Sequence, residues 1–269
     1  MVTKDEVIIP NGERIYMDDG RAKEKAAVSE DIYNAEVEQA MTEQVIKNNV
    51  AEITGKLKGE FVYSHSVFGE DFYTVRARVP RLSQSFDEIP LLISNRLLNL
   101  NELYENKVVR AQGQFRSYNQ HIEGKSKLLL SLFVRDLEVL DMSEEELATS
   151  ENPNQIFLDG YVCKTPVYRK TPLGREITDL LLAVNRPYNK SDYIPAIAWG
   201  RNARFASHFP VGSKLKIWGR IQSRNYQKRI NENGETELRT AFEVSISKME
   251  TEKQDFQTSE STPGEKEEK

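Results

Sequence analysis

Apolar and polar residues alternate through most of residues 50–250, with the period of two that is typical of half-buried strands. In the second half of this region, strands are expected in IFLDGYVC, EITDLLLAVN, YIPAIAWG, KLKIWGRIQSRNYQ and TAFEVSISKM. RNARFASHF, between the third and fourth of these strands, predicts a short helix. Five strands with a helix in that place predict an OB-fold, a five-stranded Greek-key barrel.

The two halves of the region repeat one pattern at a nearly constant spacing. GEDFYTVRARVPR at 69–81 aligns with GREITDLLLAVNR at 174–186, an offset of 105 residues. The same offset relates Tyr63 to Tyr168, and one inserted residue later GQFRSYNQ aligns with GRIQSRNY. The repeat predicts two homologous domains, so the expected fold class is all-β with two tandem OB-folds.

Segments of different composition flank the two domains. The helix formers in 24–48, without Gly or Pro, predict a short N-terminal helix, and the polar, low-complexity C-terminus predicts a disordered acidic tail. The expected boundaries are 1–49 for an N-terminal extension, 50–140 for the first OB-fold, 141–154 for an acidic linker, 155–250 for the second OB-fold and 251–269 for the tail.

Charge separates the second OB-fold from the rest of the chain. The formal net charge of the whole sequence is -5, yet residues 155–250 hold 16 basic and 9 acidic residues, a net charge of +7. Residues 50–140 hold 12 basic and 11 acidic residues, a net charge of +1. A basic block inside an acidic chain indicates a polyanionic partner for that block.

The fourth strand of the second OB-fold has two unlike faces, because successive side chains of a strand point in opposite directions. The odd positions are apolar and suit a barrel core: Leu215, Ile217, Gly219 and Ile221. The even positions interleave cations with two aromatic rings: Lys214, Lys216, Trp218, Arg220, Gln222, Arg224, Tyr226 and Lys228. Cations attract phosphates and exposed rings stack on unpaired bases, so the pattern favours single-stranded nucleic acid over a merely solvated edge strand.

Other aromatic residues are weaker candidates. The corresponding strand of the first OB-fold keeps only Arg116 and Tyr118, so that domain is either an auxiliary binder or a structural partner. Tyr188 and Tyr193 flank a loop in which rings could clasp a strand or simply pack a hairpin. Trp199 lies at the end of a strand, where a single Trp is more often part of the core.

Several function classes find no support in the sequence. The lone Cys163 fits a reducing compartment, and neither a signal peptide nor an apolar run long enough to span a membrane is seen. The three histidines are scattered, and Gly124-Lys125-Ser126 lacks the first glycine of a phosphate-binding loop. We therefore expect a cytoplasmic, nucleoid-associated protein that is not an enzyme and holds neither a cofactor nor a metal.

The second domain resembles the bacterial single-stranded-DNA-binding protein family, SSB. The resemblance runs through LDGYVCKTPVYRKTPLGREITDLLLAVNR, SDYIPAIAWGRNA, VGSKLKIWGRIQSRNYQ and TAFEVSISKME, and the tandem arrangement is similar to two-domain SSB-like proteins of clostridia and related Firmicutes. It implies sequence-tolerant DNA binding, with stacking aromatics at Tyr188, Tyr193, Trp199 and Tyr226. The ending GEKEEK departs from the family's acidic tail with an aromatic tip, which puts recruitment through the tail in doubt.

Together these arguments predict single-stranded DNA binding in replication, recombination or repair. The candidate binding residues are Tyr168, Tyr188, Tyr193, Trp199, Arg201, Lys216, Trp218, Arg220, Arg224, Tyr226 and Lys228, with Arg116 and Tyr118 from the first domain. The expected partners are single-stranded DNA, replication or repair proteins, and further copies of the chain, such as a dimer with four OB-folds. RNA binding, a protein-interaction scaffold and a metal-dependent nuclease are the alternatives.

Overall fold

The structure of the protein is a computed structural model that describes residues 6–8, 14–16, 48–99, 102–122, 125–187, 189–229 and 236–251. The chain divides into two units, residues 1–47 and 48–269. In the first unit, the antiparallel strands β1 (Glu6–Ile8) and β2 (Arg14–Tyr16) pair with each other. The helix predicted at 24–48 falls outside the described residues apart from its last position, and so does the predicted tail beyond Thr251.

The second unit begins with a closed five-stranded barrel, called barrel 1. Its strands are β3 (Asn49–Val67), β4 (Glu70–Pro80), β5 (Phe86–Ser94), β6 (Val108–Ile122) and β7 (Lys125–Leu140). All neighbouring pairs are antiparallel except the parallel pair β5–β7, which closes the barrel. The 3-10 helix η1 (Asn95–Leu97) follows β5, in the place of the helix in an OB-fold.

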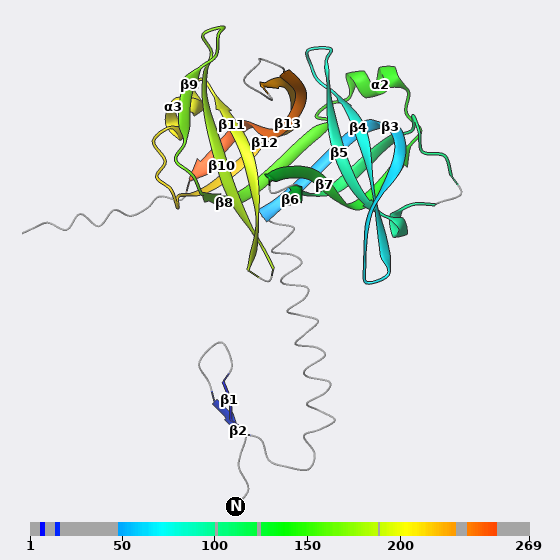
Figure 1. The fold of residues 1–269 in the computed structure, drawn as a ribbon, viewed down its shortest axis with the longest axis horizontal. Coiled ribbons are helices and arrows are strands. Elements are labelled where there is room, and N and C mark those ends of the chain that lie inside the picture. The colour runs from blue at the N-terminus through cyan, green and yellow to red at the C-terminus, as the bar shows by residue number, and fades with distance from the viewer. Residues whose placement is uncertain are drawn as a thin grey trace, which may run out of the picture. The chain divides into compact units, whose positions relative to one another are not determined.

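Barrel 2 repeats this topology in the second half of the unit (Figure 1). Its elements are β8 (Asn154–Val162), β9 (Val167–Lys170), β10 (Glu176–Arg186), β11 (Lys190–Trp199), α3 (Arg201–Ala206), β12 (Lys214–Arg229) and β13 (Thr236–Thr251). The pairing of β11 with β13 is again parallel. The predicted all-β class and OB-fold are confirmed, and β9, which pairs with β10, is a strand that the sequence pattern did not predict.

A short helix lies inside the segment that was predicted as a linker. Helix α2 (Glu144–Thr149) begins with a capping box, in which the Ser143 hydroxyl accepts from the Glu146 amide and the Glu146 carboxylate accepts from the Ser143 amide. Leu147 is buried beneath it, and Lys56 of β3 forms an ion pair with Glu144. The connection between the barrels is therefore packed against barrel 1.

One continuous sheet joins the two barrels, because β3 pairs with β8 in antiparallel register. Ala51 lies opposite Ile156, and these two residues are also equivalent in the 105-residue repeat. The β3–β8 pair therefore lies on a pseudo-twofold axis that relates the barrels. The buried side chains of both barrels, including Leu57, Phe115 and Leu158, belong to one hydrophobic core.

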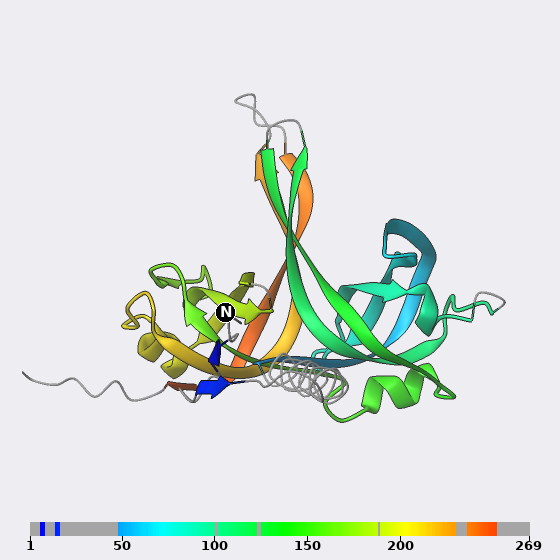
Figure 2. The same cartoon turned by 90° about the horizontal axis from the view of Figure 1, so that it is seen from below.

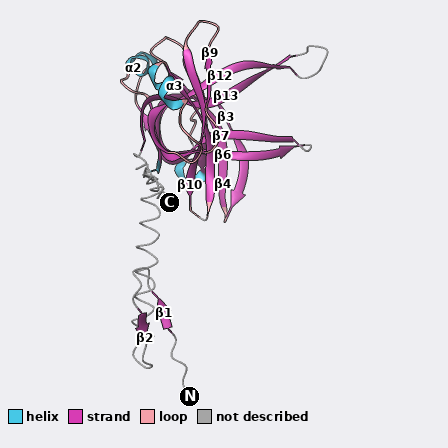
Figure 3. Ribbon diagram, turned by 90° about the vertical axis from the view of Figure 1, so that its left-hand side faces the viewer, coloured by secondary structure: helices cyan, strands magenta, loops and turns pink. Residues whose placement is uncertain are grey.

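The pseudo-twofold relation extends to the side chains that fix the hairpins. Asn49 exchanges two hydrogen bonds with the backbone of Phe115, and Asn154 exchanges two with the backbone of Ile221. These bonds hold the two long hairpins, β6–β7 and β12–β13, at the base of each barrel. Both hairpins project from the same side of the barrels (Figures 2 and 3).

Candidate nucleic-acid interface

Two predicted binding residues, Arg220 and Arg116, lie in the contact between the barrels. Arg220 of β12 reaches across to barrel 1, where its Nη1 donates to Asp87 Oδ2 at 2.8 Å. Asp87 is 1 % exposed, and burial lowers the pKa of Arg220 while the attraction of Asp87 raises it. The Arg220 guanidinium therefore contributes to the barrel contact, whatever it adds to nucleic-acid binding.

Arg116 of β6 lies two residues after Gln114, the repeat equivalent of Arg220. Its guanidinium lies 4.1 Å from the ring centroid of Phe133 and donates to Gln114 at 2.6 Å. Burial, followed by repulsion from Arg135 and Arg186, lowers the pKa of Arg116 to about 10, so the side chain is still charged at neutral pH. In the repeat, Gln114 of barrel 1 is equivalent to Arg220 of barrel 2, and Arg116 is equivalent to Gln222. The arginine and the glutamine therefore exchange places between the barrels.

Strand β11 presents two predicted stacking residues on the outward side of barrel 2. Tyr193 is 43 % exposed, and its backbone amide donates to the Ser117 hydroxyl of barrel 1 at 2.8 Å. Trp199 is half-buried, with its indole Nε1 donating to the Ser245 hydroxyl of β13 at 3.1 Å. We call the outward side of β11, from Tyr193 to Trp199, the β11 face.

Tyr168 and Arg201 lie beyond the end of this face. Tyr168 of β9 is opposite Thr178 of β10, which is opposite Ala198 of β11, so Tyr168 is on the other side of the sheet from Trp199. The Tyr168 hydroxyl donates to Glu176 Oε1 at 2.7 Å, and Arg204 Nε donates to Glu176 Oε2 at the same distance. These bonds lower the pKa of Glu176 and raise the pKa of Tyr168. Arg201, the first residue of α3, is exposed and lies two residues after Trp199 in the chain. The Tyr168 ring is thus held in place by its hydroxyl while 40 % of the residue stays exposed.

The β12–β13 hairpin holds Arg224 and Tyr226. The Arg224 guanidinium lies 5.7 Å from the Tyr226 ring centroid and 3.8 Å from Glu243 of β13. Arg224 is exposed and Tyr226 half-buried, so a cation and a ring are offered together on the hairpin. The side chain of Lys228 and the whole of Tyr188 lie outside the described part of the structure.

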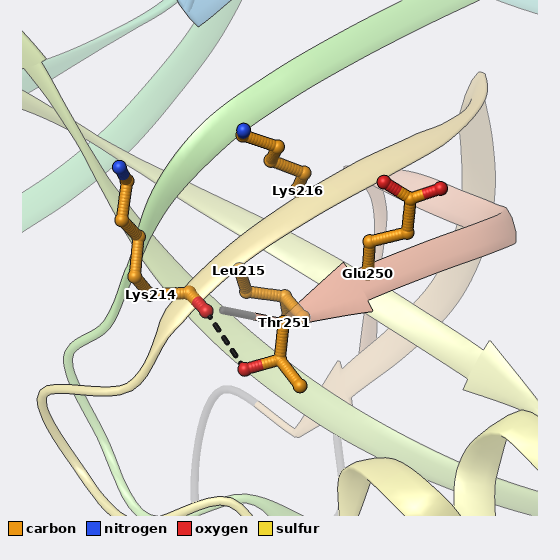
Figure 4. A pocket seen from close by; sticks show the side chains of 5 residues that line it. All are labelled: Lys214, Leu215, Lys216, Glu250 and Thr251. Atoms are coloured by element: carbon orange, nitrogen blue, oxygen red, sulfur yellow. Dashed lines mark hydrogen bonds between the residues drawn. The ribbon is translucent and has the colours of Figure 1, made fainter. Parts of the chain in front are cut away.

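Trp218 and Lys216 belong to a different surface, on the shared sheet. Trp218 packs against Phe157 of β8 with ring centroids 5.0 Å apart, and the Lys248 ammonium lies 4.5 Å from its ring centroid. Lys216 lines a hollow of about 100 Å³ with Lys214, Leu215, Glu250 and Thr251, where the Thr251 hydroxyl donates to the Lys214 carbonyl (Figure 4). We call the side of the sheet that carries Val50, Phe157 and Trp218 the outer face.

Barrel 1 carries rings and cations that the strand-by-strand comparison missed. Phe133 of β7 lies between the guanidinium groups of Arg116 and Arg135, which are 4.1 and 4.9 Å from its ring centroid. Phe72 and His65 stack beyond it, with ring centroids 5.1 Å apart. Tyr118 on the β6–β7 hairpin is 67 % exposed. The alternation of Phe133 and Arg135 on one strand was the signal that could have found this group.

The described residues contain no group of three or more His, Cys, Asp or Glu side chains placed to hold a metal ion. Within the same residues, no helix is long and apolar enough to cross a membrane.

The comparison with family models matches residues 153–251 to the Single-strand binding protein family. A single-stranded DNA-binding protein of Clostridium tetani is 35 % identical over 83 residues, covering 28 % of this chain and 57 % of the relative. Single-stranded DNA-binding protein A of Bacillus subtilis is 34 % identical over 83 residues, covering 28 % of this chain and 48 % of the relative. The chain therefore spans about half the length of the curated relatives it matches.

Solved structures extend the likeness of the fold to both barrels. The wild-type single-stranded DNA binding protein from Thermus aquaticus superposes with a TM-score of 0.55 at 18 % identity, covering 77 % of this chain and 93 % of that one. A deletion mutant of the same protein covers 79 % of this chain and 98 % of its own, with a TM-score of 0.54 at 19 % identity. Residues 153–251 of this chain, which form barrel 2, are therefore similar to the Single-strand binding protein family, and the tandem of two OB-folds is a fold that the solved structures share.

Proposed function

We propose that the protein binds single-stranded DNA with little sequence preference and does not catalyse a reaction on it. The observation that carries the proposal is the β11 face, where Tyr193 and Trp199 present partly exposed rings on the domain that matches the Single-strand binding protein family. The role that follows is protection of unpaired strands in replication, recombination or repair, at the nucleoid in the cytoplasm.

The chemistry of the surface suits unpaired bases. Every base has a flat π-face, so stacking on Tyr193, Trp199 and Tyr226 tolerates any sequence and contributes roughly 1–3 kcal/mol per base. Arg224 and Arg201 supply cations for the backbone phosphates, and release of condensed counterions makes such contacts favourable at low salt. Duplex DNA hides its base faces in the stack, so the β11 face discriminates in favour of single strands.

The test is a titration of a fluorescent dT oligomer, followed by anisotropy, with Tyr193→Ala and Trp199→Ala. Each change should weaken binding by about fivefold or more, the lower end of one lost stack. Tyr63→Ala is the matched control, because Tyr63 is 56 % exposed but lies on β3 of barrel 1, away from the β11 face. Equal affinities for all three variants and the wild type would remove the β11 face from the proposal.

Salt dependence tests the contribution of Arg224. Each phosphate contact with a single strand contributes about 0.7 to the negative slope of log K against log salt, so Arg224→Ala should make the slope shallower by about that amount. Arg110→Ala is the control, because Arg110 is a half-buried arginine paired with Glu138 at 2.8 Å on the strands of barrel 1. A slope that changes equally in both variants would contradict a phosphate contact at Arg224.

RNA is the competing ligand, since stacking and phosphate contacts do not require a DNA sugar. Competition between matched dT and U oligomers separates the two. Tighter binding of the U oligomer would transfer the proposal to RNA. Survival of the DNA during incubation with Mg²⁺ or Mn²⁺ is the expected result for a protein that is not a nuclease.

We also propose that the protein forms a homo-oligomer, a dimer with four OB-folds, through the outer face. Val50, 39 % exposed, lies opposite Phe157 in the sheet, and Phe157 lies opposite Trp218. These apolar side chains cross the junction between the barrels, beside the pseudo-twofold axis. A second copy turned by 180° would bring the same patch against itself, which is the geometry of a closed dimer.

A further inference from the structure

A groove of about 320 Å³ lies between barrel 1 and the long hairpin of barrel 2. Strands β4 and β5 form one wall and strands β12 and β13 the other. Its volume is at the lower end of the range of ligand pockets. The lining residues are Arg76, Arg78, Ser85, Phe86 and Glu88 from barrel 1, and Ser223, Asn225 and Thr240 from the hairpin.

The barrel 1 wall combines positive charge with an aromatic ring. The Arg78 guanidinium lies 3.7 Å from the centroid of the Phe86 ring, and Phe86 is 41 % exposed. Glu88 is shared by two cations, Arg76 at 3.3 Å and Lys58 at 3.9 Å. The charged residues that line the wall are Arg76, Arg78 and Glu88, so the wall keeps a positive excess that attracts a phosphate.

The hairpin wall is uncharged and can form hydrogen bonds. The Thr240 hydroxyl donates to Asn225 Oδ1 at 2.8 Å across the two strands of the hairpin. Ser223 is anchored to barrel 1, because its amide donates to Asp87 and its hydroxyl accepts from the Glu88 amide at 3.1 Å. The hairpin wall is thus fixed against β5, so the groove is present without a ligand to shape it.

The pseudo-twofold axis relates this groove to the β11 face. Glu88 is the repeat equivalent of Tyr193, and Ser223 is the equivalent of Ser117. Arg76 and Arg78 stand where barrel 2 has Leu181 and Ala183. The two related places therefore have equivalent backbone positions but different side chains. In barrel 1 the exposed aromatic residue is Phe86, two residues before the position equivalent to Tyr193.

We propose that this groove, built by both barrels, binds one nucleotide of the same single strand that crosses the β11 face. The phosphate lies against Arg76 and Arg78, and the base stacks on the Arg78–Phe86 pair, since both guanidinium planes and aromatic rings stack on bases. The inference depends on the proposed function, and it makes barrel 1 a direct contributor to binding.

Photo-crosslinking tests the placement on the unmodified full chain. A dT oligomer with 5-bromouracil at single positions is bound, irradiated and digested, and the crosslinked peptides are identified by mass spectrometry. Crosslinks are expected in residues 76–88 of barrel 1 and in the hairpin around Asn225 or Thr240. Crosslinks confined to residues 160–205 would overturn the groove while leaving the proposed function intact.

Two substitutions test the energetics. Phe86→Ala should weaken binding of the dT oligomer by about fivefold or more through the lost stack. Arg78→Gln keeps a polar side chain of similar length and should make the salt slope shallower by about 0.7. Arg110→Ala, at a residue that does not line the groove, should change neither quantity beyond its small effect on charge.

The outcomes separate the two proposals. If the wild type binds dT and both groove variants match Arg110→Ala, the groove inference is wrong and the proposed function stands. If the wild type itself fails to bind dT or any other single strand, the proposed function is wrong and the groove falls with it. Thermal unfolding of each variant shows whether a loss of affinity comes from a loss of folded protein.

Discussion

The carboxylate of Asp192 in barrel 2 accepts a hydrogen bond from the backbone amide of Ser117 in barrel 1, with an N–O distance of 2.7 Å. The repeat places Asp87 and Ser223 in the equivalent positions, and there the amide of Ser223 donates to Asp87 at 2.6 Å. Both carboxylates are almost fully buried. Each barrel therefore fixes the hairpin of the other, which positions the hairpin residues proposed to meet DNA.

Removal of the Asp87 carboxylate should destabilise the contact between the barrels. Asp87 accepts from Arg81, from Arg220 and from the Ser223 amide, so Asp87→Ala leaves two partly buried guanidinium groups without their counter-charge. Breaking a buried ion pair costs about 3–5 kcal/mol, and the partial exposure of the arginines favours the lower end. Urea unfolding measures the loss, with the exposed Asp136→Ala as control. A loss no larger than the control would contradict this account of the contact.

Asp192 should make stability depend on pH in the acid range. Burial raises the pKa of Asp192 above its ordinary value of 3.8, against the opposing pull of the Ser117 amide and Arg186. The folded state then binds the proton more tightly than the unfolded state. This contribution is therefore fully present below pH 3.8 and is lost as the pH rises through the raised value.

The measurement is urea unfolding of the wild type and Asp192→Asn across this window. The Asn side chain does not titrate and can still accept from the Ser117 amide, so the variant should lose this part of the pH dependence. A variant whose free energy of unfolding changes with pH just as the wild type does would show that Asp192 is not the group responsible.

Gly219 and Gly113 should tolerate no side chain, because each lies at a shift of register between the strands of its hairpin. A Cβ on Gly219 would lie 2.1 Å from the Ser245 carbonyl oxygen, and one on Gly113 would lie 2.0 Å from that of Phe133. Overpacking of this kind costs about 1–3 kcal/mol, and each kcal/mol lowers Tm by about 2–4 °C for a unit of this size. Differential scanning calorimetry of Gly219→Ala, with Gln112→Ala as control, checks it; an unchanged Tm would contradict the close approach.

Trp218 should act in self-association rather than in stacking. Its ring contacts Phe157 of β8 and the Lys248 ammonium of β13, the strands on either side of β12, which leaves less of the ring for a base. Trp218→Ala should therefore lower the mass measured by sedimentation equilibrium and leave the affinity for a short dT oligomer nearly unchanged. Tyr193→Ala should leave the mass unchanged and weaken the affinity for the dT oligomer. Weaker DNA binding by Trp218→Ala at an unchanged mass would instead return Trp218 to the DNA-binding surface.

The fold was largely predictable, because both the strand periodicity and the 105-residue repeat can be identified directly from the order of residues along the chain. Alternation placed Leu215, Ile217 and Ile221 in the core of barrel 2, where all three are fully buried. Strand β9 was missed because its residues, from Val167 to Lys170, are all exposed and show no alternation of burial. Helix α2 was missed because its acidic capping sequence was interpreted as a linker.

The candidate site was predictable only in part. Alternation put Trp218, Arg220 and Arg224 on one side of β12, which is correct for a straight strand. The register of β12 with β13 shifts between Trp218 and Gly219, and beyond it β12 leaves β8 and continues as a hairpin. The single row of side chains is thereby divided among the outer face, the barrel contact and the hairpin.

The sequence by itself determined two OB barrels, their repeat and the positive charge of the second, because periodicity, spacing and charge can be counted along one chain. Only the tertiary structure decided which cations are available to a ligand. Arg220 is engaged by Asp87, 133 residues earlier, while Arg76 and Arg78 of the nearly neutral barrel 1 line a groove with Asn225. The pairing of a charge depends on distance in space, and a β-barrel brings together residues whose separation along the chain carries no trace of that distance.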